Sequence, residues 1–262
     1  MRVRNLTLAL GFSSLLIFGC TKEKPALMMP ITTSSELALK YYEAGLVAYD
    51  QIKLSLAWHS LEIAVEQDPD FFMAYFWMYF LSSKDSNTIF EKALKTKASL
   101  TPAEEEVKAS LKYLVDGQKE KVEEHLGNVI DMYPSDPRTH KMLYQIQYFY
   151  FKDVDAAITS LKSAIKECPD YPWAYNLLGY AYKEQKDFEN AEKAFDNYIR
   201  VAPDQANPYD SKGDYFMAIK EFEKAYNSYM KAYEIDPVYF EMSKKRAEKA
   251  KMLQEKEAKE IS

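Results

Sequence analysis

The sequence predicts an all-α fold, in which about six helical hairpins stack into an α-α superhelix (a solenoid). Three observations predict it: a repeat of 34 residues, a low glycine content and recurring helix-start signals. Only 7 glycines occur in 262 residues, which disfavours a protein of short strands and glycine-rich turns. The composition, 47% hydrophobic and 28% charged, is typical of a globular chain.

The period is visible at several independent positions. Pro169, Pro203 and Pro237 are spaced 34 residues apart. The same interval joins five further sets of residues: Ala157, Ala191 and Ala225; Leu161, Phe195 and Tyr229; Tyr148, Tyr182 and Phe216; Val154, Phe188 and Phe222; and Gly179 with Gly213. A fixed period of this length is typical of an array whose units bury their apolar faces against their neighbours.

Residues 172–205 show how each period is expected to fold. A first helix is predicted from about Trp173 to Gln185, and a second from about Phe188 to Val201. Pro203 then stops the second helix. The pattern resembles the tetratricopeptide repeat. This resemblance implies a right-handed superhelix whose first helices line a concave groove.

The array is expected over residues 37–239. Its repeats are predicted near residues 38–71, 72–101, 103–136, 138–171, 172–205 and 206–239. Residues 72–101 fit the pattern poorly and are predicted as a degenerate hairpin, with helices near Phe72–Ser83 and Thr88–Ala98. Residues 240–262 are highly charged and are predicted as a C-terminal capping helix with a charged tail.

Helix-start signals support this phasing. Residues 101–104 read Thr-Pro-Ala-Glu, which predicts a capping box with proline in the first helical position. Residues 136–137 (Asp-Pro) and 207–208 (Asn-Pro) repeat the order of a capping residue followed by proline. The interval from Pro134 to Pro169 is 35 residues, which indicates one inserted residue in that repeat.

Residues 1–19 have the features of a signal peptide. Arg2 and Arg4 precede the apolar stretch Leu6–Phe18, which at thirteen residues is shorter than the roughly 20 needed to span a bilayer. The stretch ends Leu-Ile-Phe-Gly before Cys20, which resembles the lipobox of bacterial lipoproteins, although Phe18 is bulkier than usual. An uncleaved anchor or an ordinary secretory signal is the alternative.

The lipobox resemblance implies a tetratricopeptide-repeat lipoprotein of bacteria, anchored in a membrane by acyl chains on Cys20. Thr21, rather than an aspartate, follows the cysteine. This favours the outer membrane of a Gram-negative bacterium, at its periplasmic face or the cell surface. Residues 20–36 are predicted to form a flexible tether between the lipid and the first helix.

No catalytic, cofactor or metal site is predicted. His59, His125 and His140 fall on separate predicted helices, without the spacing that puts two ligands on one helical face. Residues 104–106 are three glutamates in a first helical turn, where the helix dipole favours negative charge. Cys168 precedes a proline at a helix end and is expected to pack as a small hydrophobe. The net charge of −6 argues against nucleic-acid binding.

The resemblance also predicts a partner-binding groove, lined by first-helix residues. Its predicted lining is apolar and aromatic in the middle of the chain and polar and acidic towards the C-terminus. It consists of Tyr42, Tyr49, Leu111, Met142, Ile146, Phe149, Tyr150, Trp173, Asn176, Tyr180 and Lys183, with Val107, Leu114, Asp210 and Asp214 at neighbouring positions. Aromatic anchors in a groove are typical of peptide recognition. The alternative is that some of these residues pack against each other in a tightly wound superhelix.

The function that the sequence favours is therefore a lipid-anchored adaptor without catalytic activity. It is expected to bind a protein or peptide partner of the cell envelope, in envelope assembly or secretion, and to need no metal or cofactor. An accessory lipoprotein for nutrient or glycan capture is the alternative. No set of residues recommends an enzyme.

Overall fold

A computed structural model describes residues 27–82 and 86–261 of the chain. Within these residues the chain forms thirteen α-helices and one π-helical segment, and no strand, so the predicted all-α fold is confirmed. The elements are α1 (Glu36–Asp50), α2 (Leu54–Gln67), α3 (Phe72–Leu81), α4 (Ser86–Lys95), α5 (Pro102–Val115), α6 (Lys119–Met132), α7 (Pro137–Gln145), η1 (Ile146–Tyr150), α8 (Val154–Glu167), α9 (Pro172–Glu184), α10 (Phe188–Val201), α11 (Asn207–Ala218), α12 (Phe222–Ile235) and α13 (Glu241–Ile261).

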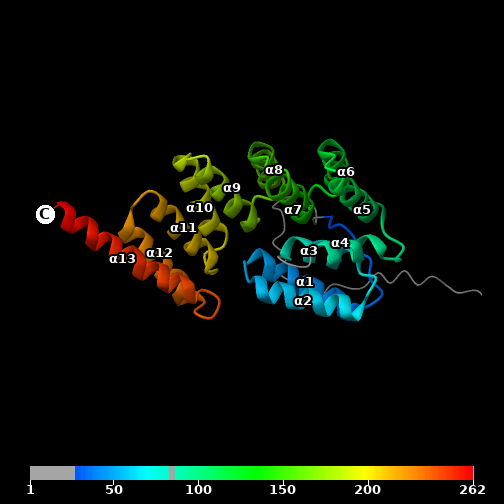
Figure 1. Ribbon diagram of the computed structural model, residues 1–262, viewed down its shortest axis with the longest axis horizontal. Helices are drawn as coiled ribbons and strands as arrows, with labels where there is room; N and C mark the ends of the chain where they lie inside the picture. Colours follow the sequence, from blue (N-terminus) through cyan, green and yellow to red (C-terminus); the bar gives the residue numbers. More distant parts are fainter. Residues whose placement is uncertain (1–26, 83–85, 262) are drawn as a thin grey trace, which may run out of the picture.

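Consecutive helices form hairpins that stack side by side into an elongated, curved array (Figure 1). The odd-numbered helices from α1 to α11 are the first helices of the hairpins, and η1 continues α7. The last helix, α13, packs on α12 and projects beyond the array at the C-terminal end (Figure 1). From Lys251 to Glu260 its residues are exposed apart from the half-buried Leu253, so its first half is the packed part.

Small residues let the two helices of a hairpin approach closely. A Cβ atom on Gly179 in α9 would lie 2.6 Å from the ring of Phe195 in α10. Gly213 and Tyr229 show the same relation in the next hairpin, again at 2.6 Å. The residues of the 34-residue pattern therefore meet each other inside each hairpin.

The one-residue insertion is taken up by the π-helical segment η1. In the hairpin of α9 and α10, the turn is closed by Asp187 N–H, which donates to the carbonyl of Tyr182, five residues back (2.9 Å). The corresponding donor after η1, Asp153 N–H, bonds to Gln147, six residues back (2.9 Å). A π-helical turn absorbs one extra residue without ending a helix. The insertion predicted between Pro134 and Pro169 thus lies at the end of the first helix of that repeat.

The degenerate hairpin forms the core of the N-terminal half. Its first helix, α3, starts at Phe72 as predicted and ends at Leu81, earlier than predicted. The second, α4, starts at Ser86 and ends at Lys95, both earlier than predicted. Every residue of α3 from Phe72 to Met78 is buried. Because these seven residues are all buried, α3 is apolar around its whole circumference and lacks the polar face of the other first helices.

Two of the three predicted helix-start signals are confirmed. Thr101 and Glu104 form the capping box of α5, with each side chain accepting from the other residue's backbone N–H (3.3 and 2.9 Å). The Asp136 side chain caps α7. Asn207, however, is the first residue of α11 rather than its cap, and Ala206 takes the capping position.

The structure does not describe the predicted signal peptide or Cys20. Among the described helices, none is both long and apolar enough to cross a membrane. The prediction of a flexible tether over residues 20–36 is wrong for residues 27–35, which form an extended segment docked on the array. We call residues 27–35 the strap.

Candidate interaction surface

Most residues predicted to line the groove are covered by the chain itself. Those that are buried are Tyr42, Tyr49, Val107, Leu111, Leu114, Met142, Ile146, Trp173, Asn176 and Asp210. Tyr180, Lys183 and Asp214 are half-buried. Phe149 and Tyr150 alone among the predicted lining residues are exposed, to 51% and 43%. The buried side chains are therefore part of the packing, as the tightly wound alternative supposes.

Part of the covering comes from the C-terminal end of α1, whose last residues contact α7. Lys141 of α7 is only 2% exposed, and its Nζ donates to Asp50 Oδ1 at 2.5 Å. The same ammonium lies 3.8 Å from the ring centroid of Tyr49, 4.7 Å from that of Trp173 and 5.5 Å from that of Trp77. The aromatic faces and the carboxylate compensate for the hydration that the ammonium loses on burial.

Further hydrogen bonds close this contact. The hydroxyl of Tyr171 donates to both carboxylate oxygens of Asp50, each at 3.1 Å, and Gln145 Nε2 donates to Tyr49 Oη at 2.7 Å. Burial lowers the pKa of Lys141 below its usual 10.5, and the Asp50 carboxylate opposes that shift.

The turn that follows α1 reaches the last hairpin. Lys53 Nζ lies 2.9 Å from Asp236 Oδ2 and 5.0 Å from the ring centroid of Tyr239. A cleft of about 230 Å³ separates this turn from the loops before α11 and α13, and its lining is mostly polar. The end of α1 and the turn after it therefore connect the N-terminal hairpin to α7, to the start of α9 and to the last hairpin.

The C-terminal part of the groove is not the acidic surface that the sequence predicts. Asp210 accepts from Ser243 Oγ (2.5 Å) and from Arg246 Nη1 (2.7 Å), both on α13. Asp214 accepts from the hydroxyls of Tyr180 (2.9 Å) and Tyr229 (2.6 Å). Arg246 Nη1 also lies 3.7 Å from Asp214 Oδ1, so one guanidinium of α13 faces both carboxylates. The capping helix fills the position that another repeat would occupy.

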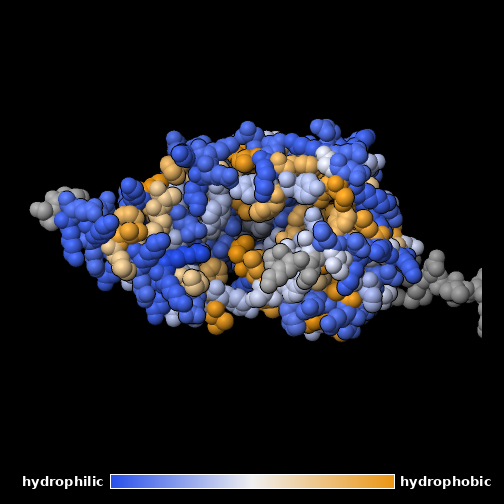
Figure 2. Space-filling model, in the orientation of Figure 1, coloured by the Kyte–Doolittle hydropathy of each residue, from blue (hydrophilic) through white to orange (hydrophobic). Residues whose placement is uncertain are grey.

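The exposed aromatic pair follows directly from the π-helical segment. Phe149 and Tyr150 occupy the last two positions of η1, where the aligned residues of α9 are Lys183 and Glu184. Figure 2 shows a hollow in the face that it presents, with apolar residues along part of its border. Phe149 and Tyr150 are large apolar side chains that remain exposed, and such side chains are candidates for contact with a partner.

The strap lies across the starts of three first helices. The Met29 N–H donates to Asp136 Oδ2 at 3.0 Å, at the start of α7. The N–H and hydroxyl of Thr32 donate to Glu104 at 2.8 and 2.5 Å, at the start of α5. The Thr33 hydroxyl and the Ser34 N–H donate to Asp68 at 2.6 and 2.7 Å, just before α3. Each carboxylate comes from a different hairpin.

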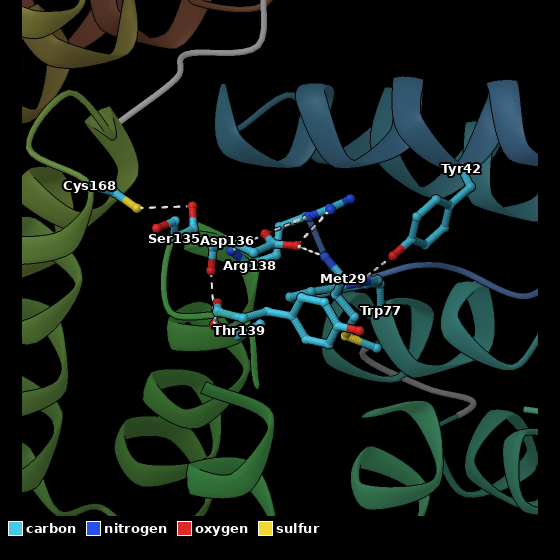
Figure 3. Close-up of polar contacts among 9 residues, drawn as sticks. Met29, Tyr42, Trp77, Ser135, Asp136, Arg138, Thr139 and Cys168 are labelled. Carbon is cyan, nitrogen blue, oxygen red and sulfur yellow. Dashed lines mark hydrogen bonds and ion pairs between the residues drawn. The ribbon is translucent and has the colours of Figure 1, made fainter. Parts of the chain in front are cut away.

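Asp136 shows how these carboxylates are held (Figure 3). It is fully buried, and it accepts from the backbone N–H, Nε and Nη2 of Arg138 at 3.0, 2.9 and 2.7 Å. The guanidinium balances its charge, and the N–H of Met29 completes its hydrogen bonds. The Met29 side chain is buried beside Tyr42 and Trp77, whose Nε1 donates to the Tyr42 hydroxyl at 3.1 Å (Figure 3).

The histidines and Cys168 have structural partners. His125 Nδ1 lies 2.6 Å from Glu106 Oε2, and His140 Nε2 lies 3.0 Å from the carbonyl of Pro134. Within the described residues, no group of three or more His, Cys, Asp or Glu side chains is placed to hold a metal ion. Cys168 is buried, as predicted, and its Sγ donates to the carbonyl of Ser135 at 3.4 Å.

Two features escaped the sequence reasoning. The strap was missed because its residues, Leu-Met-Met-Pro-Ile-Thr-Thr-Ser-Ser, have neither helical nor strand periodicity. Its hydroxyl-rich composition is the one available signal. Lys141 was missed because it stands beside the predicted groove residue Met142 and carries no motif of its own.

Part of the chain matches known repeat families. A model of the TPR repeat matches residues 147–186, and a model of the tetratricopeptide repeat matches residues 174–205 and 206–239. These are the residues in which the 34-residue period is most regular. No curated protein matches the sequence.

Three solved structures among those that match this chain are described here. A thermophilic TPR protein of Thermus thermophilus is 15% identical, with a TM-score of 0.51 over 82% of this chain and 99% of its own. A structure of MamA is 23% identical, with a TM-score of 0.46 over 59% of this chain and 92% of its own. A second MamA structure is 17% identical, with a TM-score of 0.40 over 77% of this chain and 93% of its own.

Identities this low bear on the fold alone, and the Thermus protein carries that comparison. Proteins built from such repeats generally act as interaction scaffolds rather than catalysts. The chain therefore has the fold of a tetratricopeptide-repeat solenoid, and residues 147–239 match the repeat family itself.

Proposed function

We propose that this protein is a lipid-anchored, non-enzymatic adaptor of the bacterial cell envelope, acting in envelope assembly or secretion. The tandem repeats support the adaptor role, because stacked hairpins present extended surfaces to other proteins. The lipobox-like sequence before Cys20 supports the anchor, and Thr21 supports the outer membrane. Two or more acyl chains on one cysteine would hold the protein stably in a bilayer.

The partner is proposed to bind at the end of η1. The observation that carries this proposal is the exposure of Phe149 and Tyr150, at 51% and 43%, among groove positions that are otherwise covered. The ring of Phe149 packs edge-on against Tyr148 (4.9 Å between ring centroids), and that of Tyr150 packs edge-on against Phe151 (5.2 Å). The surface fits a peptide or helix that packs apolar side chains against these rings.

The anchor is tested by replacing Cys20. The wild-type protein should incorporate a labelled fatty acid and remain with the membranes after a salt wash. Cys20→Ala should lose the label and appear in the soluble fraction. A wild-type protein that carries no acyl group would refute the anchor and leave the adaptor proposal intact.

The partner site is tested by a photoreactive amino acid at position 149 in cells, which should cross-link one protein reproducibly. Phe149→Ala and Tyr150→Ala should each weaken binding of that purified protein by about 30-fold, because a buried aromatic anchor contributes about 2 kcal/mol. Met252→Ala is the matched control, since Met252 is an exposed apolar residue on α13, at the far end of the chain. Equal binding by all three variants would refute the site, and capture of an oligosaccharide instead would favour the nutrient-capture alternative.

A further inference from the structure

The strap changes how far the array can stand from a lipid on Cys20. If residues 20–35 were all free, sixteen residues would allow a separation of about 55 Å, at about 3.4 Å per extended residue. With residues 27–35 docked, the seven residues 20–26 allow about 25 Å. The docked strap thus halves the reach of the anchor.

The strap also selects the side of the array that is held near the anchor. Its contacts lie at the start of α3, α5 and α7, through Asp68, Glu104 and Asp136. Phe149 and Tyr150 lie at the other end of the same layer, where η1 ends the helix that α7 begins. A helix such as α5, with 14 residues, separates its two ends by about 20 Å.

We propose that the strap orients the array on the membrane, so that the starts of α3, α5 and α7 face the lipid surface and the aromatic pair at the end of η1 faces away from it. This proposal rests on the acylation of Cys20 proposed above. It assigns the lipid surface as the neighbour of one edge of the array and leaves the opposite edge for the protein partner.

The contacts are suited to bear this role. Hydrogen bonds to ionised carboxylates are stronger than neutral ones, and five donors of the strap reach such acceptors. The three carboxylates lie at the starts of three different first helices, so the strap is fixed to the array at three points along its length. The buried side chain of Met29 fixes the end of the strap that is nearer to Cys20.

Two labelling sites on the same helix layer test the orientation. Ser99 is exposed just before α5, and Asp116 is exposed just after it. Each is replaced by cysteine in an acylated Cys168→Ala protein and labelled with a fluorescent donor. The protein is inserted into vesicles of phosphatidylethanolamine and phosphatidylglycerol that carry a headgroup acceptor. Transfer from position 99 should exceed that from position 116 by about 1.5-fold or more, because about 20 Å separates the two ends.

Release of the strap should remove this difference. Met29→Asp places a charge in a buried site next to Asp136, whereas Leu27→Asp makes the same change at an exposed position of the strap. Transfer from the two sites should become nearly equal in the Met29→Asp protein and stay unequal in the Leu27→Asp protein. Equal transfer in the protein with an intact strap overturns the proposed orientation.

Amide exchange in the unanchored Cys20→Ser protein separates the possible failures. The N–H groups of Met29, Thr32 and Ser34 should exchange about tenfold or more slowly than in the Met29→Asp variant. Fast exchange in both proteins overturns the strap. If exchange is slow but the acylated protein shows equal transfer from its two labels, the orientation is overturned and the anchor is not. A chain without acyl groups overturns the anchor, and the orientation with it.

Discussion

Replacement of Asp50 by alanine tests whether the contact between Lys141 and the N-terminal hairpin holds the array closed. Lys141 is 2% exposed, so Asp50→Ala would leave a buried ammonium without its carboxylate and the Tyr171 hydroxyl without its acceptor. Breaking a buried ion pair from one side costs about 3–5 kcal/mol. The Asp50 side chain is 31% exposed, so water can partly replace it, and we expect the lower end, about 3 kcal/mol.

The partner substitution should behave differently. Lys141→Met retains most of the apolar contact with Tyr49 and Trp173 and leaves Asp50 paired with the Tyr171 hydroxyl. We expect a cost of about 1 kcal/mol. In the double variant the unpaired ammonium is absent, so Lys141→Met should restore about 2 kcal/mol to the Asp50→Ala protein.

Urea unfolding at 25 °C, followed by both tryptophan fluorescence and circular dichroism, measures these free energies. The ring centroids of Trp77 and Trp173 lie 5.5 and 4.7 Å from Lys141 Nζ, so tryptophan fluorescence reports on this contact directly. If the two losses of stability simply add, so that the double variant is less stable than Asp50→Ala, then an unpaired buried ammonium is not what destabilises Asp50→Ala.

The same contact makes a prediction about pH. Burial lowers the pKa of Lys141 in the folded state, and the loss of Asp50 removes an opposing effect, so the folded-state pKa falls further. The unfolded chain then holds the proton more tightly than the folded chain. Stability of Asp50→Ala relative to wild type should therefore increase as the pH rises towards about 10. A constant difference across that range would contradict the assignment.

Three further predictions concern the hairpins and the strap. Gly179→Ala should lower the free energy of unfolding by about 1–3 kcal/mol, because the added Cβ would lie 2.6 Å from the Phe195 ring. Gly127→Ala, whose Cβ would have no atom within 4 Å, should raise it by about 0.5–1 kcal/mol. Thermal unfolding compares the two variants. Ile52 has a φ of 60° in the turn after α1, so Ile52→Asn should stabilise by about 1 kcal/mol in urea unfolding, and a loss of stability would show that its side chain matters more than its backbone strain. Burial opposes ionisation of Asp68, but hydrogen bonds from the strap outweigh it and hold the pKa of Asp68 below 3.8. The stabilisation from these bonds is present above pH 3.8 and is lost as the pH falls through the lowered pKa. Amide exchange in the strap, corrected for intrinsic rates, should therefore accelerate at that pH in wild type and not in Asp68→Asn.

The helices could be predicted because their signals are local. Proline and a capping residue define where a helix can begin, as Thr101 and Glu104 show at α5. The 34-residue interval identified the residues that meet inside each hairpin, such as Gly179 and Phe195. Even the extra residue before Pro169 was visible as an interval of 35.

The candidate surface could be predicted only in part. The repeat register names the residues that point to the concave side, but it does not say which of them the chain covers. Tyr49 and Phe149 are both named by that register, yet one is buried and the other is 51% exposed. Whether a groove is open depends on how sharply the array curves, and that curvature adds up small rotations over many hairpins.

The sequence by itself determined the all-helical array, its period, the start of most helices and the position of an inserted residue. Only the tertiary structure decided that the end of α1 contacts Lys141, that Arg246 of α13 pairs with Asp210, and that residues 27–35 dock on the array. The physical reason is distance along the chain. The carboxylates that hold the strap lie between 34 and 107 residues along the chain from its donors. The local sequence of an extended, hydroxyl-rich segment does not indicate which of these distant acceptors it will contact.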